Sequence, residues 1–181
     1  HTRLTDVTGV RRVLFRSPAM LALINGYARD GIMLPRNEFE LSEGVRDFTV
    51  LEDGGRLLGC AALHFYGPTI AEVRSLAVLP EMKGSGAGRM LMDAIDAEAR
   101  EFDLDIVFAF TYVPGFFAKM GYREARREEL PLKAWKDCLR CPKFQACDEI
   151  AVVRALKPGA SLDRMGAPSP ELVQIPSVHP N

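Results

Sequence analysis

The sequence predicts one α/β (α+β) domain built around a mixed, mostly antiparallel sheet that helices flank. Two observations support this prediction. Residues 48–78 contain three successive strand patterns joined by short turns, as in an antiparallel meander. Residues 86–112 contain a long amphipathic pattern followed by an apolar strand pattern, which is typical of a crossover unit. A meander followed by a crossover gives both antiparallel and parallel strand pairs.

The first half of the chain is predicted to form two helices and three strands. Ser17-Pro18 supplies a cap and a first-turn proline for the first helix. Gly54-Gly55 is typical of a hairpin turn, and Gly67-Pro68 ends a strand. The expected helices cover residues 19–28 and 38–45, and the expected strands cover residues 48–51, 57–66 and 70–78.

The second half is predicted to add two helices and three strands. Almost every residue from 106 to 112 is apolar, which is typical of a strand buried on both faces. The expected helices cover residues 86–102 and 115–120, and the expected strands cover residues 106–112, 122–126 and 149–156. The longer helix has an apolar stripe that we expect to be buried, formed by Met90, Leu91, Ala94, Ile95 and Ala99.

Composition and charge exclude several classes of protein. The chain has 181 residues, of which 48 % are hydrophobic and 26 % charged, as in ordinary globular domains. A net charge of −1 gives no indication of nucleic-acid binding. The longest apolar runs are too short to span a membrane, and no signal peptide is visible. We therefore expect a cytoplasmic protein.

The two ends of the chain are excluded from the expected domain, which covers residues 18–156. Residues 1–17 carry four arginines without a helical or strand period. Within them, residues 6–17 resemble a translated sequencing adapter, which makes a non-natural leader one reading and a disordered basic arm the other. Residues 157–181 contain five prolines and are expected to form a disordered tail.

A glycine-rich turn joins the strand of residues 70–78 to the long helix. Glycines let the backbone approach a ligand closely, and the start of a helix offers unpaired N–H groups. Lys83 and Arg89 add positive charge. The turn therefore indicates a pyrophosphate site, formed by Lys83, Gly84, Ser85, Gly86, Ala87, Gly88 and Arg89. No Gly-Lys-Ser/Thr closes the turn, so a P-loop is disfavoured.

The pattern Lys83-x-x-Gly86-x-Gly88 resembles the acetyl-CoA motif of the GNAT acetyltransferases, Gln/Arg-x-x-Gly-x-Gly/Ala. Lys83 departs from that motif but keeps a cation. The resemblance covers roughly residues 18–156 and implies a single GNAT-like domain with a splayed central strand pair. It also implies acetyl-CoA as the co-substrate, with the pantetheine lying along Leu76, Ala77 and Val78 and an oxyanion-stabilising N–H near Leu76.

Longer segments resemble one branch of that family, the short N-acetylglutamate synthases. They include Ile24-Asn-Gly-Tyr-Ala28, Glu72-Val-Arg-Ser-Leu-Ala-Val78, Thr111-Tyr-Val-Pro-Gly-Phe-Phe117 and Trp135-Lys-Asp-Cys-Leu-Arg-Cys-Pro-Lys-Phe144. The resemblance implies acetyl transfer to the α-amino group of L-glutamate, the first step of arginine biosynthesis. A homodimer is also expected.

Glutamate carries two carboxylates, for which arginine is the preferred partner. Arg74 lies two residues from Glu72 and therefore on the same face of the strand. The other candidate substrate-binding cations come from predicted loops and are Arg36, Lys136 and Arg140. For the loop residues a solvated surface charge is the alternative.

Two residues are candidates for the chemical step. Glu72 is the candidate general base, directly or through a water, or else only the ion-pair partner of Arg74. Phe117 stands where the GNAT family usually has its tyrosine acid. Tyr112, at the end of the apolar strand, is therefore the candidate that protonates the departing thiolate, with solvent as the alternative.

Cys138-x2-Cys141-x5-Cys147 has the spacing of half a structural zinc site. The alternatives are reduced thiols packing a loop and a redox-sensitive cluster. Cys60 is expected in the core. Two rival functions stay open: an acetyltransferase for another amine or a protein N-terminus, and a non-catalytic acyl-CoA sensor.

Overall fold

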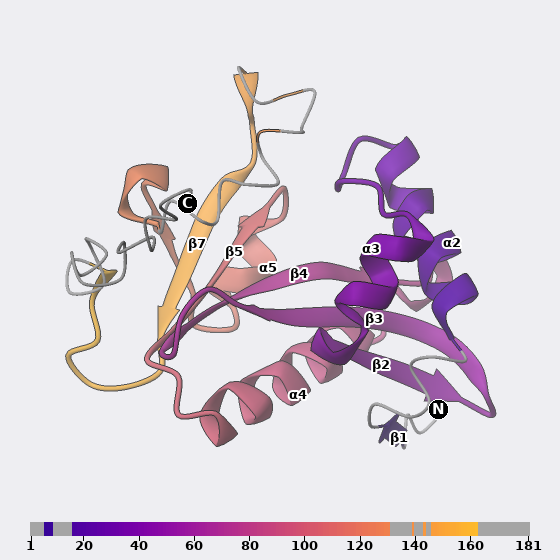
Figure 1. Cartoon of the computed structure of the whole chain (residues 1–181), viewed down its shortest axis with the longest axis horizontal. Coiled ribbons are helices and arrows are strands. Elements are labelled where there is room, and N and C mark those ends of the chain that lie inside the picture. The colour runs from indigo at the N-terminus through magenta and orange to yellow at the C-terminus, as the bar shows by residue number, and fades with distance from the viewer. Residues whose placement is uncertain (1–5, 9–15, 131–138, 140–142, 144–145, 163–181) are drawn as a thin grey trace, which may run out of the picture.

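The computed structural model describes residues 6–8, 16–130, 139, 143 and 146–162. In this part of the chain one mixed sheet has the strand order β1-β2-β3-β4-β5-β7-β6 (Figure 1). The strands are β1 Asp6–Thr8, β2 Phe48–Asp53, β3 Arg56–Phe65, β4 Ile70–Val78, β5 Ile106–Thr111, β6 Arg123–Ala125 and β7 Ile150–Ala155. The helices are α2 Ser17–Arg29, α3 Glu38–Glu43, α4 Ala87–Glu101 and α5 Pro114–Ala118, with short 3-10 turns at Val45–Asp47, Pro80–Met82 and Arg127–Glu129.

The predicted fold class is confirmed. β4 and β5 pair in parallel, and the other described strand pairs are antiparallel. Gly54 and Gly55 both have positive φ in the turn between β2 and β3, as a tight hairpin requires. The helices begin and end within a few residues of the expected positions. The spatial order of the last two strands could not be predicted, and β7 lies between β5 and β6.

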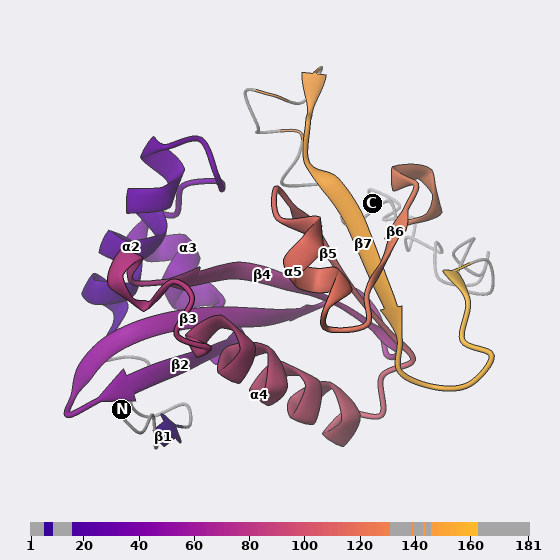
Figure 2. The same cartoon turned by 180° about the vertical axis from the view of Figure 1, so that it is seen from behind.

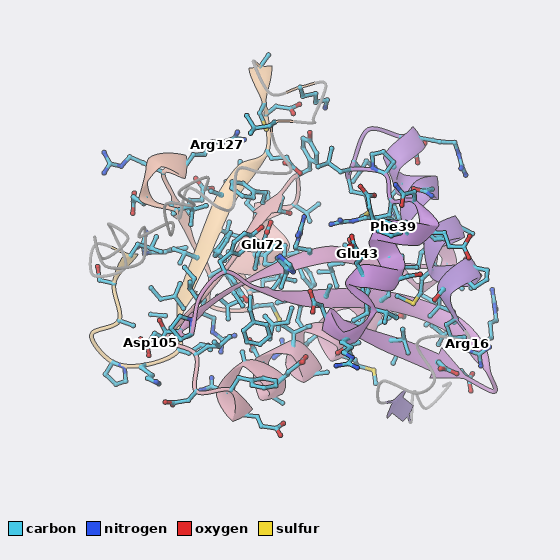
Figure 3. The ribbon with its side chains drawn as sticks, in the orientation of Figure 1. Arg16, Phe39, Glu43, Glu72, Asp105 and Arg127 are labelled. Carbon is cyan, nitrogen blue, oxygen red and sulfur yellow. The ribbon has the colours of Figure 1, made fainter. Side chains whose placement is uncertain are left out.

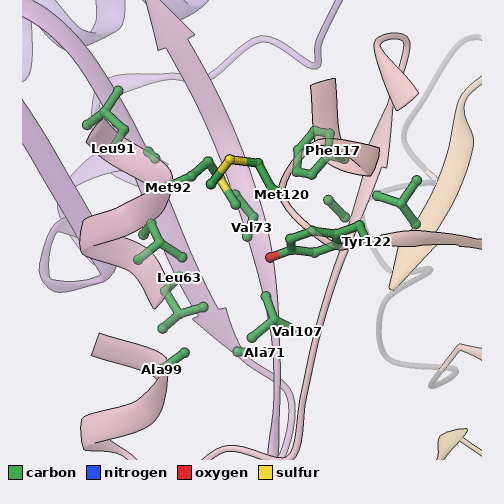
Figure 4. Close-up of a cluster of buried hydrophobic side chains, with 14 of the residues drawn as sticks. Leu63, Ala71, Val73, Leu91, Met92, Ala99, Val107, Phe117, Met120 and Tyr122 are labelled. Atoms are coloured by element: carbon green, nitrogen blue, oxygen red, sulfur yellow. The ribbon is translucent and has the colours of Figure 1, made fainter. Parts of the chain in front are cut away.

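The helices cover both faces of the sheet. α2 and α3 lie on one face, and α4 crosses the opposite face (Figures 1 and 2). Two apolar clusters correspond to these layers, one around Met20, Ile24 and Leu41 and the other around Leu91 and Ile95. Side chains from strands β3, β4 and β5 complete the second cluster (Figure 4).

The buried stripe of α4 differs from the predicted one. Leu91, Ile95 and Ala99 are fully buried as expected, but Met90 and Ala94 are only half-buried. Met92 takes their place in the core and is fully buried. The buried face of α4 therefore extends to Met92, which packs in one cluster with Phe117, Met120 and Tyr122 from α5 and the segment after it.

Close packing of α4 on the sheet depends on a glycine in β3. A Cβ on Gly59 would lie 2.7 Å from the Ala77 carbonyl oxygen and 3.1 Å from Leu91 Cδ1. Cys60, next in the strand, is fully buried, as predicted.

The described residues near the N-terminus touch the domain. Asp6–Thr8 pairs with β2, and Arg16 forms an ion pair with Glu52 at 2.9 Å. The expectation that residues 1–17 are not the natural start stays a prediction, as do the boundaries at 18 and 156. In the described ranges, no helix is long and apolar enough to cross a membrane.

Candidate active site

The central strands splay apart, as the sequence resemblance implied. β4 and β5 are paired only from Ile70 to Glu72 and from Ile106 to Phe108, and they diverge beyond these residues. A cavity of about 170 Å³ opens where they separate. It is lined by Ile32, Met33, Leu34, Arg36, Glu72, Val73, Arg74, Ser75, Leu76, Phe110, Thr111, Tyr112, Val113, Phe117 and Glu149.

A bulge in β4 shapes the cavity wall. Ala62 of β3 is opposite Arg74, whereas Cys60 is opposite Ala77, so β4 has one more residue than β3 in this interval. Ser75 absorbs the extra residue with a left-handed φ of 51°. The bulge places the backbone of Ser75 and Leu76 at the cavity, where the proposed oxyanion N–H would lie.

Cys60 supports the bulge from beneath. Its thiol donates a hydrogen bond to the Ser75 carbonyl oxygen at 3.7 Å. Burial raises the pKa of the Cys60 thiol to about 12, so the group is neutral and keeps its proton for this bond.

Glu72 lies in the wall of the cavity, near the centre of the molecule (Figure 3). The side chain is almost completely buried, and this burial raises the pKa of its carboxyl group. Arg74 Nε lies 3.5 Å from Oε2, and the Tyr66 hydroxyl donates to the same oxygen at 2.8 Å; both contacts lower the pKa. In the described part of the chain no hydrogen-bond donor reaches Oε1, which leaves that oxygen for a ligand.

Two of the four predicted substrate cations line the cavity. Arg74 comes from β4 and Arg36 from the loop between α2 and α3. Asn25 of α2 fixes this loop, because its side-chain amide donates to the Arg36 carbonyl at 2.8 Å and accepts from the Arg36 N–H at 2.9 Å. Lys136 and Arg140 lie outside the described residues.

Tyr112 lies at the β5 end of the cavity and belongs to a polar triad. Its hydroxyl donates to Asp148 Oδ1 at 2.7 Å and accepts from Lys143 Nζ at 3.0 Å. Partial burial raises the pKa of the phenol, and the Lys143 ammonium opposes that shift. A phenol has a single proton, so in this arrangement the proton is directed at Asp148.

Phe117 also lines the cavity, but it is buried and carries no titratable group. It packs edge-on against Phe116 and Tyr122, with ring centroids 5.4 and 5.2 Å apart. Its role in this structure is to close the apolar side of the cavity.

The glycine turn has the geometry expected of an anion site. Gly84 and Gly86 have φ values of 79° and 95°, and a Cβ on either would point into open space. Gly86 is the N-cap residue of α4 and has no side chain to cap the helix. Ser85 Oγ accepts from the Ala87 N–H at 3.3 Å. Gly88 lies under Phe116, which brings α5 against the turn.

The pantetheine-binding residues predicted on β4 differ in accessibility. Leu76 lines the cavity, whereas Ala77 is buried against the α2 side of the core. The Val78 carbonyl accepts a hydrogen bond from the Tyr27 hydroxyl at 2.8 Å. Leu76 is therefore the one of the three that faces the cavity.

The predicted zinc site gains no support. Among the described residues, no three His, Cys, Asp or Glu side chains come close enough to hold a metal. Arg127 donates to Cys147 Sγ at 2.8 Å, so a cation occupies the position next to that sulfur. Cys138 and Cys141 lie outside the described residues.

Sequence reasoning missed four polar residues of the site. Glu149 and Thr111 line the cavity, Tyr66 donates to Glu72, and Asn25 fixes the Arg36 loop. Burial raises the pKa of the Glu149 carboxyl group, with Arg127 opposing this shift. Glu149 and Thr111 stand at ends of predicted strands, which is a usable signal. Tyr66 and Asn25 act through contacts that no local pattern reveals.

The sequence of this chain, with its splayed strands β4 and β5 and the glycine turn after β4, is similar to that of known acetyltransferases. A model of the acetyltransferase (GNAT) domain matches residues 44–124. An uncharacterised N-acetyltransferase of Chlorobaculum tepidum is 42 % identical over 156 residues, which cover 86 % of this chain and 94 % of that protein. An amino-acid acetyltransferase of Mycobacterium tuberculosis is 37 % identical over 110 residues, covering 59 % and 63 % of the two chains.

Solved structures agree with these relatives. N-acetylglutamate synthase from Neisseria gonorrhoeae, complexed with coenzyme A and N-acetyl-glutamate, superposes with a TM-score of 0.71 at 31 % identity. The match covers 78 % of this chain and 33 % of the Neisseria chain. A Mycobacterium tuberculosis protein in complex with CoA gives a TM-score of 0.71 at 27 % identity and covers 84 % of this chain and 99 % of that one.

The chain belongs to the GNAT family of N-acetyltransferases. It is an acetyl-CoA-dependent N-acetyltransferase whose relatives include amino-acid acetyltransferases. The chain spans about a third of the Neisseria synthase. The similarity alone therefore does not assign the substrate of that larger enzyme to this chain.

Proposed function

We propose that this chain transfers the acetyl group of acetyl-CoA to the α-amino group of L-glutamate. The observation that carries the proposal is the meeting of Glu72, Arg74 and Arg36 at one cavity between the splayed strands. Two guanidinium groups complement two carboxylates, and a carboxylate with a raised pKa complements an ammonium group that must lose a proton.

The proposed chemical step is direct transfer. Glu72 accepts a proton from the ammonium group of the acceptor, directly or through a water. The freed nitrogen attacks the thioester carbonyl carbon, and a backbone N–H at the Ser75–Leu76 bulge stabilises the oxyanion. A C–N bond forms, the C–S bond breaks, and the thiolate of coenzyme A leaves.

The leaving thiolate takes a proton from Tyr112 or from solvent. Tyr112 is close enough to the cavity to serve, but its proton is held by Asp148 in this structure. Transfer from Tyr112 therefore requires its hydroxyl to turn from Asp148 toward the thiolate, while Lys143 stabilises the phenolate that results.

The proposed donor site runs along β4 to the start of α4. Leu76 to Val78 lie beside the pantetheine, and residues 83–89 surround the pyrophosphate. The site needs no metal ion for the chemistry described. We expect the enzyme in the cytoplasm as a homodimer, supplying the first step of arginine biosynthesis.

The test is release of the coenzyme A thiol from acetyl-CoA with separate acceptors. L-Glutamate, L-aspartate, L-glutamine and a small peptide are compared as acceptors for the full chain. A kcat/KM that is highest for glutamate supports the proposal. A preference for the peptide, L-aspartate or L-glutamine overturns it, and assigns the chain to an acetyltransferase for another amine.

A further inference from the structure

We propose that Tyr27 is a positioning residue of the donor site, which holds the Lys83 ammonium where the pyrophosphate of acetyl-CoA binds. The inference rests on the proposed placement of the pyrophosphate at the glycine turn. It concerns a contact between α2 and that turn, which lie far apart in the sequence. Tyr27 has no part in the acceptor cavity described above.

The geometry consists of two contacts made by one side chain. Lys83 Nζ lies 4.8 Å from the centroid of the Tyr27 ring, within the range of a cation–π interaction. The Tyr27 hydroxyl donates to the Val78 carbonyl oxygen at 2.8 Å. The ring is thus fixed to the end of β4, beside the turn that carries Lys83.

Apolar side chains also hold the Tyr27 ring in place. It packs against the apolar cluster that α2 and α3 form on the sheet. A ring anchored at its hydroxyl and packed at its base has a fixed face, so the ammonium above it has a defined position.

The contact with Tyr27 restricts the flexible side chain of Lys83. Its ammonium is a point charge on a flexible stem, and ordering that stem has an entropic cost. Lys83 is exposed, and among the described residues no carboxylate pairs with it. The Tyr27 face offers attraction without neutralising the charge. The ammonium is therefore ordered before the donor arrives and stays available for a phosphate oxygen.

The test is a double-mutant cycle on the affinity for coenzyme A, measured by calorimetry without any acceptor. Tyr27→Leu is expected to weaken binding by about three- to fivefold, the range for a partly exposed cation–π pair. In a Lys83→Met background the same change is expected to have almost no effect. Tyr27→Phe keeps the ring, so its coupling to Lys83 is expected to persist.

Arg89 provides the matched control. It is also a cation at the turn, but its Nε lies 3.9 Å from Asp93 Oδ2, whereas the cation over the Tyr27 ring is Lys83. Tyr27→Leu and Arg89→Met are therefore expected to weaken binding additively. If Tyr27→Leu weakens binding equally in the Lys83 and Lys83→Met backgrounds, Tyr27 is only a structural residue and the proposal is wrong.

The test allows for a variant that does not fold, and it does not depend on the identity of the acceptor. Tyr27→Met retains more apolar volume without a ring face and replaces Tyr27→Leu if that variant does not fold, as judged by circular dichroism. Because no acceptor is present, failure of glutamate as substrate leaves the result unaffected. Equal weakening of coenzyme A binding by Tyr27→Leu in the Lys83→Met and Arg89→Met backgrounds also contradicts the proposal.

Discussion

Glu72 shows how opposing effects act on one carboxyl group. Burial favours the protonated form, whereas Arg74 and the Tyr66 hydroxyl favour the ionised form. Burial is the largest of these effects, so the pKa of Glu72 lies above its ordinary value. A base with a raised pKa holds a transferred proton better than an exposed glutamate would, which suits it to accept one from an ammonium group.

The first prediction concerns Glu72→Gln. We expect kcat/KM to fall by about 10²- to 10⁴-fold, the usual contribution of a general base. In the unaltered chain, kcat/KM should rise with pH through the raised pKa of Glu72, because only the ionised form accepts a proton. Glu72→Gln should remove this dependence. Glu124→Gln, on the exposed strand β6, is the control, and a matching loss there would refute the assignment.

Arg74→Lys tests the acceptor side. A lysine keeps the charge but loses the fork that contacts a carboxylate through two N–H groups. We expect KM for glutamate to increase by about tenfold or more, since charge-assisted hydrogen bonds are worth roughly 1.5–3 kcal/mol. KM for acetyl-CoA should not change. Arg56→Lys, at an exposed ion pair with Glu81, is the control. An unchanged KM for glutamate would remove Arg74 from the site.

At the scale of elements, α2 holds the loop that carries Arg36. The Asn25 amide makes two hydrogen bonds to the Arg36 backbone, which fixes this loop although it has no regular structure. The same helix carries Tyr27, which contacts the end of β4. One helix therefore orders parts of both the proposed acceptor site and the proposed donor site.

Asn25→Ala should loosen the Arg36 loop without removing a charge. We expect KM for the acceptor to rise by up to about thirtyfold, since the two hydrogen bonds together are worth about 2 kcal/mol. Combined with Arg36→Met, the change should have little further effect on KM. Ser42→Ala, which removes only a bond within α3, is the control. Full additivity of Asn25→Ala and Arg36→Met would show that Asn25 acts elsewhere.

The sequence predicted elements better than it predicted contacts between them. Gly54-Gly55 and the apolar run of residues 106–112 are local signals, and both predictions were confirmed, with β5 ending at Thr111. The face shared by Glu72 and Arg74 also followed from strand periodicity. The bulge at Ser75 did not, because serine is not a residue that marks a positive φ. Contacts such as Tyr66 with Glu72 depend on strand register, which a single sequence does not reveal.

At the scale of the whole molecule, packing of α4 on the sheet decides stability. Gly59→Ala should lower the free energy of unfolding by about 1–3 kcal/mol, because the new methyl group would clash with the Ala77 backbone. Gly26→Ala, inside α2, where a Cβ would meet only the Arg29 side chain in ordinary contact at 3.8 Å, should raise it by about 0.5–1 kcal/mol. Denaturant unfolding of both variants gives the measurement. Equal effects of the two changes would show that the close approach at Gly59 is not rigid.

β4 and β5 pair over only three residues each. Among the described residues, the rest of β4 is therefore an unpaired strand edge on its β5 side, although β4 lies in the middle of the sheet. Beyond Glu72, the backbone groups of β4 that face β5 have no partner strand in the described structure. An exposed edge is a template for an extended chain with amide groups, and pantetheine is such a chain. In the proposed donor site, where the pantetheine lies along β4, the donor would act as a missing strand, and the sheet would be most continuous only while the co-substrate is bound.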